Sequence, residues 1–124
     1  MTRLDRTALG LLDEAVEVEM RTPRRDGSIS SRPIWIVVVE GDAYVRSYYG
    51  PGAAWYRRIR ADGRAALGVA GSLIEVAGEP IDDDALDGRI SAAFRAKYGR
   101  RSPGPTAGMV SPAAAATTLR LTRA

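Results

Sequence analysis

The sequence predicts an α+β, mainly β fold in which about six short, mostly antiparallel strands form a closed or half-open barrel with three covering helices. The expected elements follow the order helix, three strands, helix, two strands, helix, strand. This order departs from the strict strand–helix alternation of a parallel, doubly wound sheet. Glycine-containing turns between neighbouring strands favour antiparallel hairpins, and short strands with covering helices favour a small barrel.

One domain is expected to span residues 1–124. A chain of 124 residues buries roughly two-thirds of the surface that it exposes when unfolded, which is enough for one ordinary core. The hydrophobic share of 45% and the charged share of 27% are typical of globular domains and argue against disorder.

A short helix and a half-buried strand are expected at the start of the chain. Within Thr2–Glu14, four apolar residues fall on one face at helical spacing: Leu4, Ala8, Leu11 and Leu12. Val16, Val18 and Met20 then alternate with charged residues, which is typical of a strand with one buried face. Asp26-Gly27 predicts a turn at Arg24–Gly27.

The strongest strand pattern is SRPIWIVVV, at Ser31–Val39. It is apolar on both faces and rich in β-branched residues, so we expect a central, buried strand. Gly41-Asp42 predicts a tight hairpin into a strand at Ala43–Ser47. The next segment, Tyr48–Ala53, contains two glycines and a proline and is expected to be a loop.

A short helix and two strands are expected over residues 54–79. The helix covers Ala54–Ala61 and ends at Asp62-Gly63, where the glycine marks a stop. The strands Ala65–Val69 and Leu73–Glu79 are joined by a turn at Gly71-Ser72.

The clearest helix pattern runs from Asp82 to Tyr98. Its buried face is formed by Leu86, Ile90, Ala93 and Phe94. Asp82 is the expected N-cap, and Asp83 and Asp84 suit the positive end of the helix dipole. A capped helix start explains these three aspartates better than a metal site does. Gly99 is the expected C′ residue after the helix.

The rest of the chain is expected to hold a loop and one more strand. Arg100–Pro112 is rich in proline and glycine, which predicts a loop. Thr117–Thr122 alternates between polar and apolar residues and predicts the last strand.

The absence of cysteine and histidine limits the chemistry of the chain. Disulfides, thiolate nucleophiles and Fe–S ligation are excluded, and so are the usual zinc sites and a Ser-His-Asp triad. The remaining acid–base groups are carboxylates, tyrosines, arginines and one lysine, Lys97. No catalytic residue and no metal site stand out, so enzyme chemistry would have to be carried largely by a cofactor.

Neither a membrane segment nor a secretion signal is predicted. No apolar run reaches the roughly 18 residues that a membrane span needs. Asp5 and Arg6 interrupt the apolar stretch near the start of the chain. The cytoplasm is therefore the expected location, and no membrane partner is expected.

Four segments of the chain share their pattern with a known superfamily. Ser31–Ile59 reads SRPIWIVVVEGDAYVRSYYGPGAAWYRRI, and IEVAGEPI (Ile74–Ile81), FRAKYG (Phe94–Gly99) and MVSPAAAATTLRL (Met109–Leu121) continue the pattern. Together they resemble the flavin-binding split-barrel superfamily, which includes pyridoxamine-phosphate-oxidase-like proteins and deazaflavin-dependent nitroreductases. The likeness is greatest to an uncharacterised bacterial family within it. This resemblance implies a split β-barrel that forms a homodimer and binds FMN or the deazaflavin coenzyme F-420 between its two subunits.

The resemblance also implies the residues of a cofactor site. Arg32, at the head of the RPIW strand, is the first candidate for the cofactor phosphate, and Arg57 and Arg58 are the second. The ring system would be bordered by residues of the strands, the loop and the helix start: Pro33, Ile34, Trp35, Ser47, Tyr48, Tyr49, Gly50 and Trp55. Related proteins often use a lysine near the helix for phosphate, and this chain has none there.

The residue types suit these roles. Arginine binds phosphate through paired, charge-assisted hydrogen bonds. Gly50 and Gly52 let the backbone approach a ligand closely, and the helix start after Ala53 offers unpaired N–H groups to an anion. Four of the eight aromatic residues lie within Tyr48–Tyr56, and such a cluster suits a flat ring. Trp35 and Trp55 fit packing in the core or at an interface better than stacking on a ring.

Two functions remain open on this basis. The first is a cofactor-dependent oxidoreductase of unspecified substrate, in which the flavin or deazaflavin carries hydride and the protein orients it and excludes water. The second is a non-catalytic carrier or sensor of the same cofactor, which the sparse catalytic groups favour. Nucleic-acid binding is not expected, because the net charge is only +3 and acidic residues are interspersed among the arginines.

Overall fold

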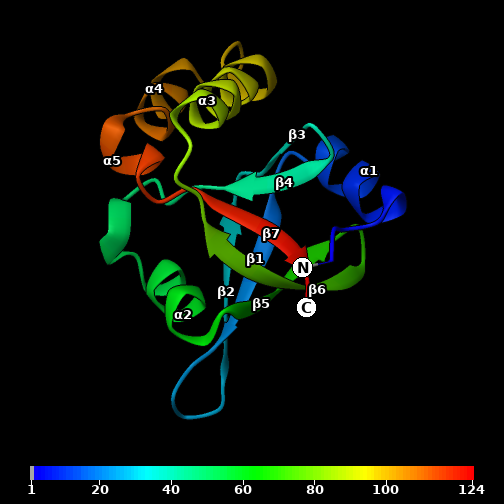
Figure 1. Cartoon of the computed structure of the whole chain (residues 1–124). Coiled ribbons are helices and arrows are strands. Elements are labelled where there is room, and N and C mark those ends of the chain that lie inside the picture. Colours follow the sequence, from blue (N-terminus) through cyan, green and yellow to red (C-terminus); the bar gives the residue numbers. More distant parts are fainter. Residues whose placement is uncertain (1) are drawn as a thin grey trace.

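The computed structural model describes residues 2–124 and contains a seven-stranded antiparallel sheet that curls into a half-barrel (Figure 1). The strands are β1 (Val18–Pro23), β2 (Ile29–Ile34), β3 (Val37–Val39), β4 (Asp42–Val45), β5 (Arg64–Val69), β6 (Ser72–Pro80) and β7 (Leu119–Arg123). Across the sheet they follow the order β2-β1-β5-β6-β7-β4-β3. The expected α+β split-barrel fold is confirmed, with seven strands where about six were predicted.

Within residues 2–124, five α-helices and one 3₁₀ turn surround the sheet. They are α1 (Arg6–Glu14), the 3₁₀ turn η1 (Gly50–Gly52), α2 (Ala54–Asp62), α3 (Asp84–Tyr98), α4 (Pro103–Met109) and α5 (Pro112–Ala115). Figure 1 shows α3, α4 and α5 gathered on one side of the sheet, with α1 and α2 apart from them. None of the helices in this part of the chain is long and apolar enough to cross a membrane.

The predicted strand Ser31–Val39 is interrupted at Trp35-Ile36, which corrects the expectation of a central strand. β2 pairs with β1 alone and β3 pairs with β4 alone, so both lie at edges of the sheet. Pro33 lacks a backbone N–H and therefore suits an edge strand. We call Trp35-Ile36 the edge link, because these two residues connect opposite edges. The edges therefore lie within roughly 11 Å of each other at this point, and the sheet must curl.

Two hairpin turns lie one residue earlier than predicted. The β3–β4 turn is centred on Glu40-Gly41 and the β5–β6 turn on Ala70-Gly71. All four central residues have a positive φ, between 50° and 83°. Positive φ at both central residues is typical of a type I′ turn, whose twist matches that of antiparallel strands.

α3 starts later than predicted and ends without the expected glycine cap. The N-cap is Asp83 rather than Asp82, because the Asp83 carboxylate accepts the Leu86 N–H at 3.0 Å. Gly99 has right-handed helical dihedral angles, with φ at −62°, instead of the left-handed conformation of a C′ residue. The chain therefore runs on into a further turn after α3.

The segment predicted as a loop, Arg100–Pro112, is mostly helical. Pro103 and Pro112 stand in the first turns of α4 and α5, where a missing N–H leaves no hydrogen bond unmade. Ser111 caps α5 by accepting the Ala114 N–H at 3.3 Å. The prolines that predicted a loop are thus helix starts.

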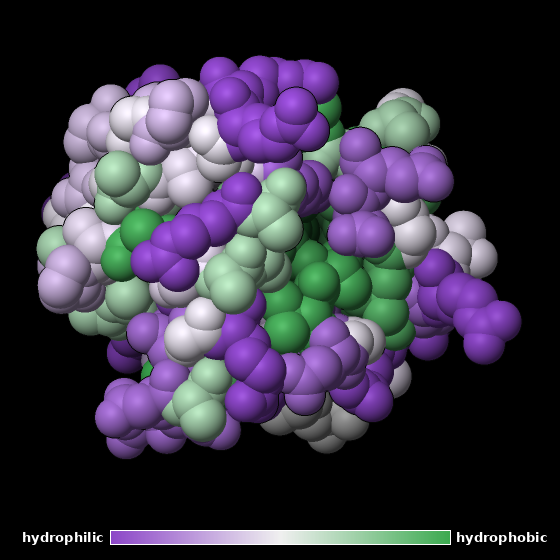
Figure 2. Space-filling model, turned by 90° about the horizontal axis from the view of Figure 1, so that it is seen from above, coloured by the Kyte–Doolittle hydropathy of each residue, from purple (hydrophilic) through white to green (hydrophobic). Residues whose placement is uncertain are grey.

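Two apolar clusters hold the fold together. Inside the half-barrel, Leu12 of α1 and Ile59 of α2 pack with strand residues such as Met20. A second cluster joins Ile90 and Phe94 of α3 to the outer side of β3 and β4. Seen from above, an apolar hollow lies between strongly hydrophilic margins (Figure 2). Full burial of each large apolar side chain stabilises the fold by about 1.5–3 kcal/mol, so both clusters fix their helices firmly.

β7 completes the sheet because it pairs with β6 on one side and with β4 on the other. It joins the four strands β2-β1-β5-β6 to the β3–β4 hairpin. Leu121 lies opposite Ala43 on β4 and opposite Gly78 on β6.

Candidate functional site

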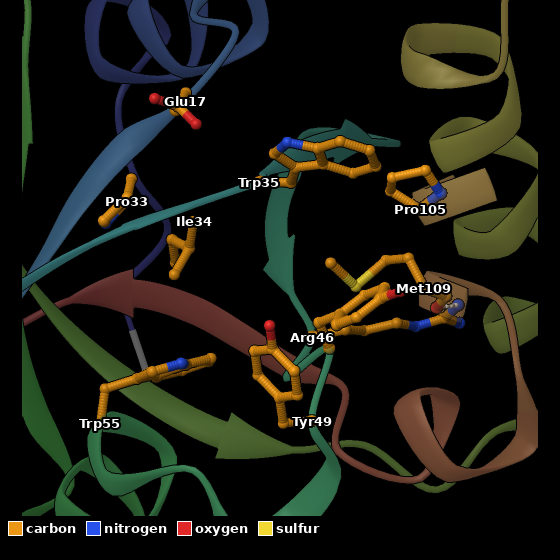
Figure 3. A pocket seen from close by; sticks show the side chains of 10 residues that line it. Glu17, Pro33, Ile34, Trp35, Arg46, Tyr49, Trp55, Pro105 and Met109 are labelled. Atoms are coloured by element: carbon orange, nitrogen blue, oxygen red, sulfur yellow. Dashed lines mark hydrogen bonds between the residues drawn. The ribbon is translucent and has the colours of Figure 1, made fainter. Parts of the chain in front are cut away.

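A cavity of about 420 Å³ opens beside the edge link, and aromatic side chains form much of its wall (Figure 3). We call it the aromatic cavity. Its lining comes from the residue before β1, the end of β2, the edge link, the segment after β4, and helices α2 and α4: Glu17, Pro33, Ile34, Trp35, Arg46, Tyr48, Tyr49, Trp55, Pro105 and Met109. Figure 3 shows Trp35, Trp55 and Tyr49 around one open space. A small number of polar groups around an apolar space is typical of a small-molecule site.

α3 fixes the Trp35 side of the cavity. The indole of Trp35 stacks on the Tyr98 ring with a centroid distance of 4.0 Å and an interplanar angle of 2°. The Tyr98 hydroxyl donates to the Val16 carbonyl at 2.7 Å and accepts the Ile36 N–H at 3.2 Å. Burial raises the pKa of Tyr98 to about 12, so the hydroxyl keeps its proton at neutral pH. The last turn of α3 therefore holds the edge link and its tryptophan in place.

Lys97, the one lysine of the sequence, makes a parallel connection. Its Nζ donates to the Ile36 carbonyl at 2.8 Å and to the Leu12 carbonyl at 3.1 Å. Burial lowers the pKa of Lys97, and the charge of Asp13 partly opposes that effect. The lysine thus ties the end of α1 to the edge link, and its contacts explain it as a structural group.

Arg46 is fully buried behind the cavity and was not among the predicted site residues. Its five N–H groups donate to Thr118 Oγ1 (2.8 Å), Ser91 Oγ (2.8 Å), the Met109 carbonyl (3.2 Å), the Asp87 carbonyl (3.1 Å) and Asp87 Oδ1 (2.8 Å). Burial lowers the pKa of Arg46, whereas the Asp87 carboxylate raises it. Because every donor is used, Arg46 anchors the wall and has no N–H left for a ligand.

The loop Tyr48–Ala53 contributes to the cavity through its tyrosines. Tyr49 is 85% exposed, and Tyr48 is 46% exposed; their rings form an edge-to-face pair with centroids 5.1 Å apart. Ser47 and Gly50 are buried beneath them, and the Ser47 hydroxyl donates to the Gly50 carbonyl at 2.6 Å. Gly50 has a φ of +79°, so its glycine serves the turn. Ser47 and Gly50 therefore shape the loop without lining the cavity.

The three arginines predicted to hold phosphate do not line the aromatic cavity. Arg32 is exposed on the edge strand β2, opposite Met20 of β1. Arg57 and Arg58 lie on α2 and line a second cavity, whereas Trp55 of the same helix lines the aromatic one. The structure thus gathers six of the predicted residues around the ring-sized space, namely Pro33, Ile34, Trp35, Tyr48, Tyr49 and Trp55, and sets the arginines apart.

The aromatic cavity offers few groups for acid–base chemistry. Its titratable lining consists of Glu17, Tyr48, Tyr49 and the saturated Arg46. Within residues 2–124, no group of three or more acidic side chains is arranged to hold a metal ion. The arrangement is suited to holding a flat ring, and any redox step would depend on that ring.

Comparison with known proteins finds one matching family and several solved structures with a similar fold. The model of a family described as an uncharacterised protein conserved in bacteria (DUF2255) matches residues 8–121. Similar solved structures include an F-420 reductase (20% identity, 92% of this chain and 90% of that chain covered, TM-score 0.57). A Listeria innocua putative pyridoxamine 5′-phosphate oxidase is also similar (13% identity, 93% of this chain and 87% of that chain covered, TM-score 0.59). The heme storage protein HutZ of Vibrio cholerae is similar as well (11% identity, 98% of this chain and 89% of that chain covered, TM-score 0.63).

These likenesses confirm the split-barrel resemblance at the level of the fold. No curated protein matches the chain in sequence. At sequence identities of 11–20%, these similarities show a shared fold and do not identify a ligand.

Proposed function

The chain belongs to the bacterial family DUF2255, and we propose that it binds FMN or the deazaflavin coenzyme F-420 and acts as an oxidoreductase on a small molecule. The observation that carries this proposal is the aromatic cavity, where Trp35, Trp55 and Tyr49 surround a space beside the edge link. Fold neighbours that include an F-420 reductase support flavin-type binding in general.

The residues present fit such a ring. The cavity volume of about 420 Å³ lies within the range of about 300–1,000 Å³ that small-molecule sites occupy. Trp35 is held flat against Tyr98, so its free side is a rigid platform. Tyr49 is 85% exposed, and a solvent-facing aromatic at a cavity rim suits stacking on a ligand or a partner.

A bound flavin or deazaflavin would supply hydride chemistry, and the chain would supply orientation and shielding from water. Pro33, Ile34, Pro105 and Met109 form the apolar, non-aromatic part of the lining. The saturated Arg46 network holds Met109 and so fixes that side of the cavity.

The cofactor phosphate is proposed to reach Arg57 and Arg58 on the neighbouring face of α2, with Arg32 as the other candidate. Arginine forms charge-assisted hydrogen bonds to phosphate that contribute about 1.5–3 kcal/mol each. If Arg32 is the phosphate contact, Arg32→Ala should therefore raise the dissociation constant of the cofactor at least about tenfold while the fold survives, since this side chain is exposed. An unchanged titration would remove Arg32 from the site and leave Arg57 and Arg58.

We further propose a homodimer with the cofactor at its interface. Leu73, which is 63% exposed, and Ile29, which is 47% exposed, are apolar side chains on strands of the sheet. Tyr49 adds an exposed ring at the rim of the aromatic cavity. A second copy that covered these groups would bury apolar surface and close the site around a ligand.

Binding is tested by fluorescence titration of the whole protein with FMN and, separately, with coenzyme F-420. Tyr49→Ala should weaken binding about two- to tenfold, as expected for losing one aromatic stacking contact. Leu9→Ala, which truncates a partly buried side chain outside the cavity lining, is the control and should leave affinity unchanged. Failure of both cofactors to bind at micromolar concentration would contradict the proposal.

The sparse acid–base inventory of the cavity favours a second candidate, a non-catalytic carrier or sensor of the same cofactor. Turnover of quinones or nitroaromatics by the protein with reduced cofactor separates the two. Tight binding without turnover would favour the carrier.

A further inference from the structure

A third cavity, of about 790 Å³, lies between the end of α1 and the end of α3. The two segments meet through hydrogen bonds from Lys97 Nζ to the Leu12 carbonyl at 3.1 Å and from the Tyr98 hydroxyl to the Val16 carbonyl at 2.7 Å. We call this space the charged cavity. Its lining includes six charged side chains: Asp13, Glu14, Glu17, Lys97, Arg100 and Arg101.

The two signs of charge come from different segments of the chain. The three carboxylates lie within residues 13–17 and the three cations within residues 97–101, so the lining has no net charge but is polarised from one segment to the other. A ligand with a single charge is attracted by one segment and repelled by the other. A ligand with opposite charges at its two ends is complementary to both.

These charges are not neutralised by one another. Within residues 2–124, no ion pair involves any of the six side chains. Elsewhere in this part of the chain opposite charges do pair, as Arg89 does with Glu40 and Arg120 with Asp42. The charged cavity therefore keeps carboxylates and cations apart and leaves both available to a ligand.

The charged cavity adjoins the aromatic cavity, because Trp35 and Glu17 line both. Figure 3 shows these two residues at the border of the aromatic cavity. Burial raises the pKa of Tyr98, and the charge of Glu17 adds to this effect, so the carboxylate lies close to the ring that supports Trp35. A ligand in the charged cavity would consequently lie beside a ring held in the aromatic one.

We propose that the charged cavity binds a small zwitterion with an amino group at one end and a carboxylate at the other. Arg100 and Arg101 bind the carboxylate, since planar guanidinium groups match its two oxygens. Glu14 and Glu17 accept hydrogen bonds from the amino group. Val16, which is 52% exposed, adds apolar surface that suits the carbon chain between the two groups. Next to a bound ring, this zwitterion is the substrate candidate, and that role alone rests on the proposed function.

The test is isothermal titration of the whole protein, without cofactor and at low ionic strength, with 6-aminohexanoate as the probe. Hexanoate and hexylammonium have the same chain length and carry one of the two charges each. The zwitterion should bind at least about threefold more tightly than either, because each lost contact between charged groups at an exposed site has a modest effect.

Two double variants assign the ends of the probe. Arg100→Ala/Arg101→Ala should raise the dissociation constant of 6-aminohexanoate about three- to tenfold. Its matched control is Arg24→Ala/Arg25→Ala, an exposed pair outside this cavity, which should change affinity less than twofold.

Glu14→Gln/Glu17→Gln should weaken binding to a similar extent. Glu75→Gln/Asp82→Asn, which neutralises two exposed carboxylates outside the cavity, is the matched control and should have little effect. Melting temperatures of all four variants check that the fold is intact.

The proposal is overturned if 6-aminohexanoate does not bind at millimolar concentration, or if a singly charged probe binds equally well. Equal weakening by the cavity variants and their controls would overturn it in favour of general charge attraction. With saturating FMN or coenzyme F-420, the zwitterion should still bind, and mutual exclusion would overturn its role as substrate. Because the first titration contains no cofactor, failure of flavin binding leaves its result readable.

Discussion

Replacing Tyr98 by phenylalanine should weaken the edge link and leave the ring that stacks on Trp35. The hydroxyl serves two backbone groups, the Val16 carbonyl at 2.7 Å and the Ile36 N–H at 3.2 Å. An unsatisfied buried polar group costs about 1–3 kcal/mol. The Ile36 contact is buried and the Val16 contact is only part-buried, so the free energy of unfolding should fall by about 1–3 kcal/mol, which urea unfolding measures. Tyr98→Leu, which also loses the stack, should cost more and should weaken flavin binding.

Alkaline pH provides an independent check of the same contact. Burial raises the pKa of Tyr98 to about 12, above the ordinary value of 10.0. The unfolded chain therefore loses this proton first, so the stabilisation is fully present below pH 10 and is lost as pH rises towards 12. The difference corresponds to roughly 2–3 kcal/mol. Phenylalanine does not ionise, so the stability gap between wild type and Tyr98→Phe should narrow over this range. A gap that stays constant from pH 8 to pH 12 would refute the reasoning.

Three further outcomes are expected. Arg46→Met should lower the free energy of unfolding by about 2–4 kcal/mol, because Asp87 then lacks its cation and several oxygens lose their hydrogen-bond donor. A loss below about 1 kcal/mol would show that the hydrogen bonds of Arg46 do not anchor α3. Gly50→Ala should lower the free energy of unfolding by about 1–2 kcal/mol, because Gly50 has a φ of +79°. Gly52→Ala should change it little, because the added Cβ would meet no atom within 4 Å. Equal melting temperatures of the two variants would contradict this difference. Light scattering should give a dimer that Leu73→Arg converts to a monomer, and a wild-type monomer at micromolar concentration would contradict the dimer.

The sequence pattern predicted most elements because their signals are local. Alternation in β1, the glycine turns and the apolar face of α3 each depend on neighbouring residues. The break in Ser31–Val39 has no such signal, because it follows from which strands lie at the sheet edges. The helices α4 and α5 were missed because proline marks both loops and helix starts, and only the tertiary contacts distinguish the two.

The sequence pointed to those lining residues of the aromatic cavity that lie close to one another along the chain. Trp35, Tyr49 and Trp55 come from one segment that the resemblance covers. Pro105 and Met109 lie in the segment expected to be a loop, so nothing local linked them to the cavity. One feature of the sequence pointed to Arg46: it is a single charged residue directly after Ala43–Val45. The structure shows that these three residues are buried. Such a charge requires partners, but the sequence does not show which oxygens supply them.

The position of β7 has a consequence for synthesis on the ribosome. Chains emerge with the N-terminal part first, at about 5–20 residues per second, and β7 is the last of the seven described strands to appear. Until it does, β6 and β4 each present a row of unpaired backbone groups to solvent. Such edges pair readily with other chains. A nascent chain that stalls before Leu119 would therefore expose two unpaired strand edges, and its tendency to aggregate would be highest until β7 filled the gap between them.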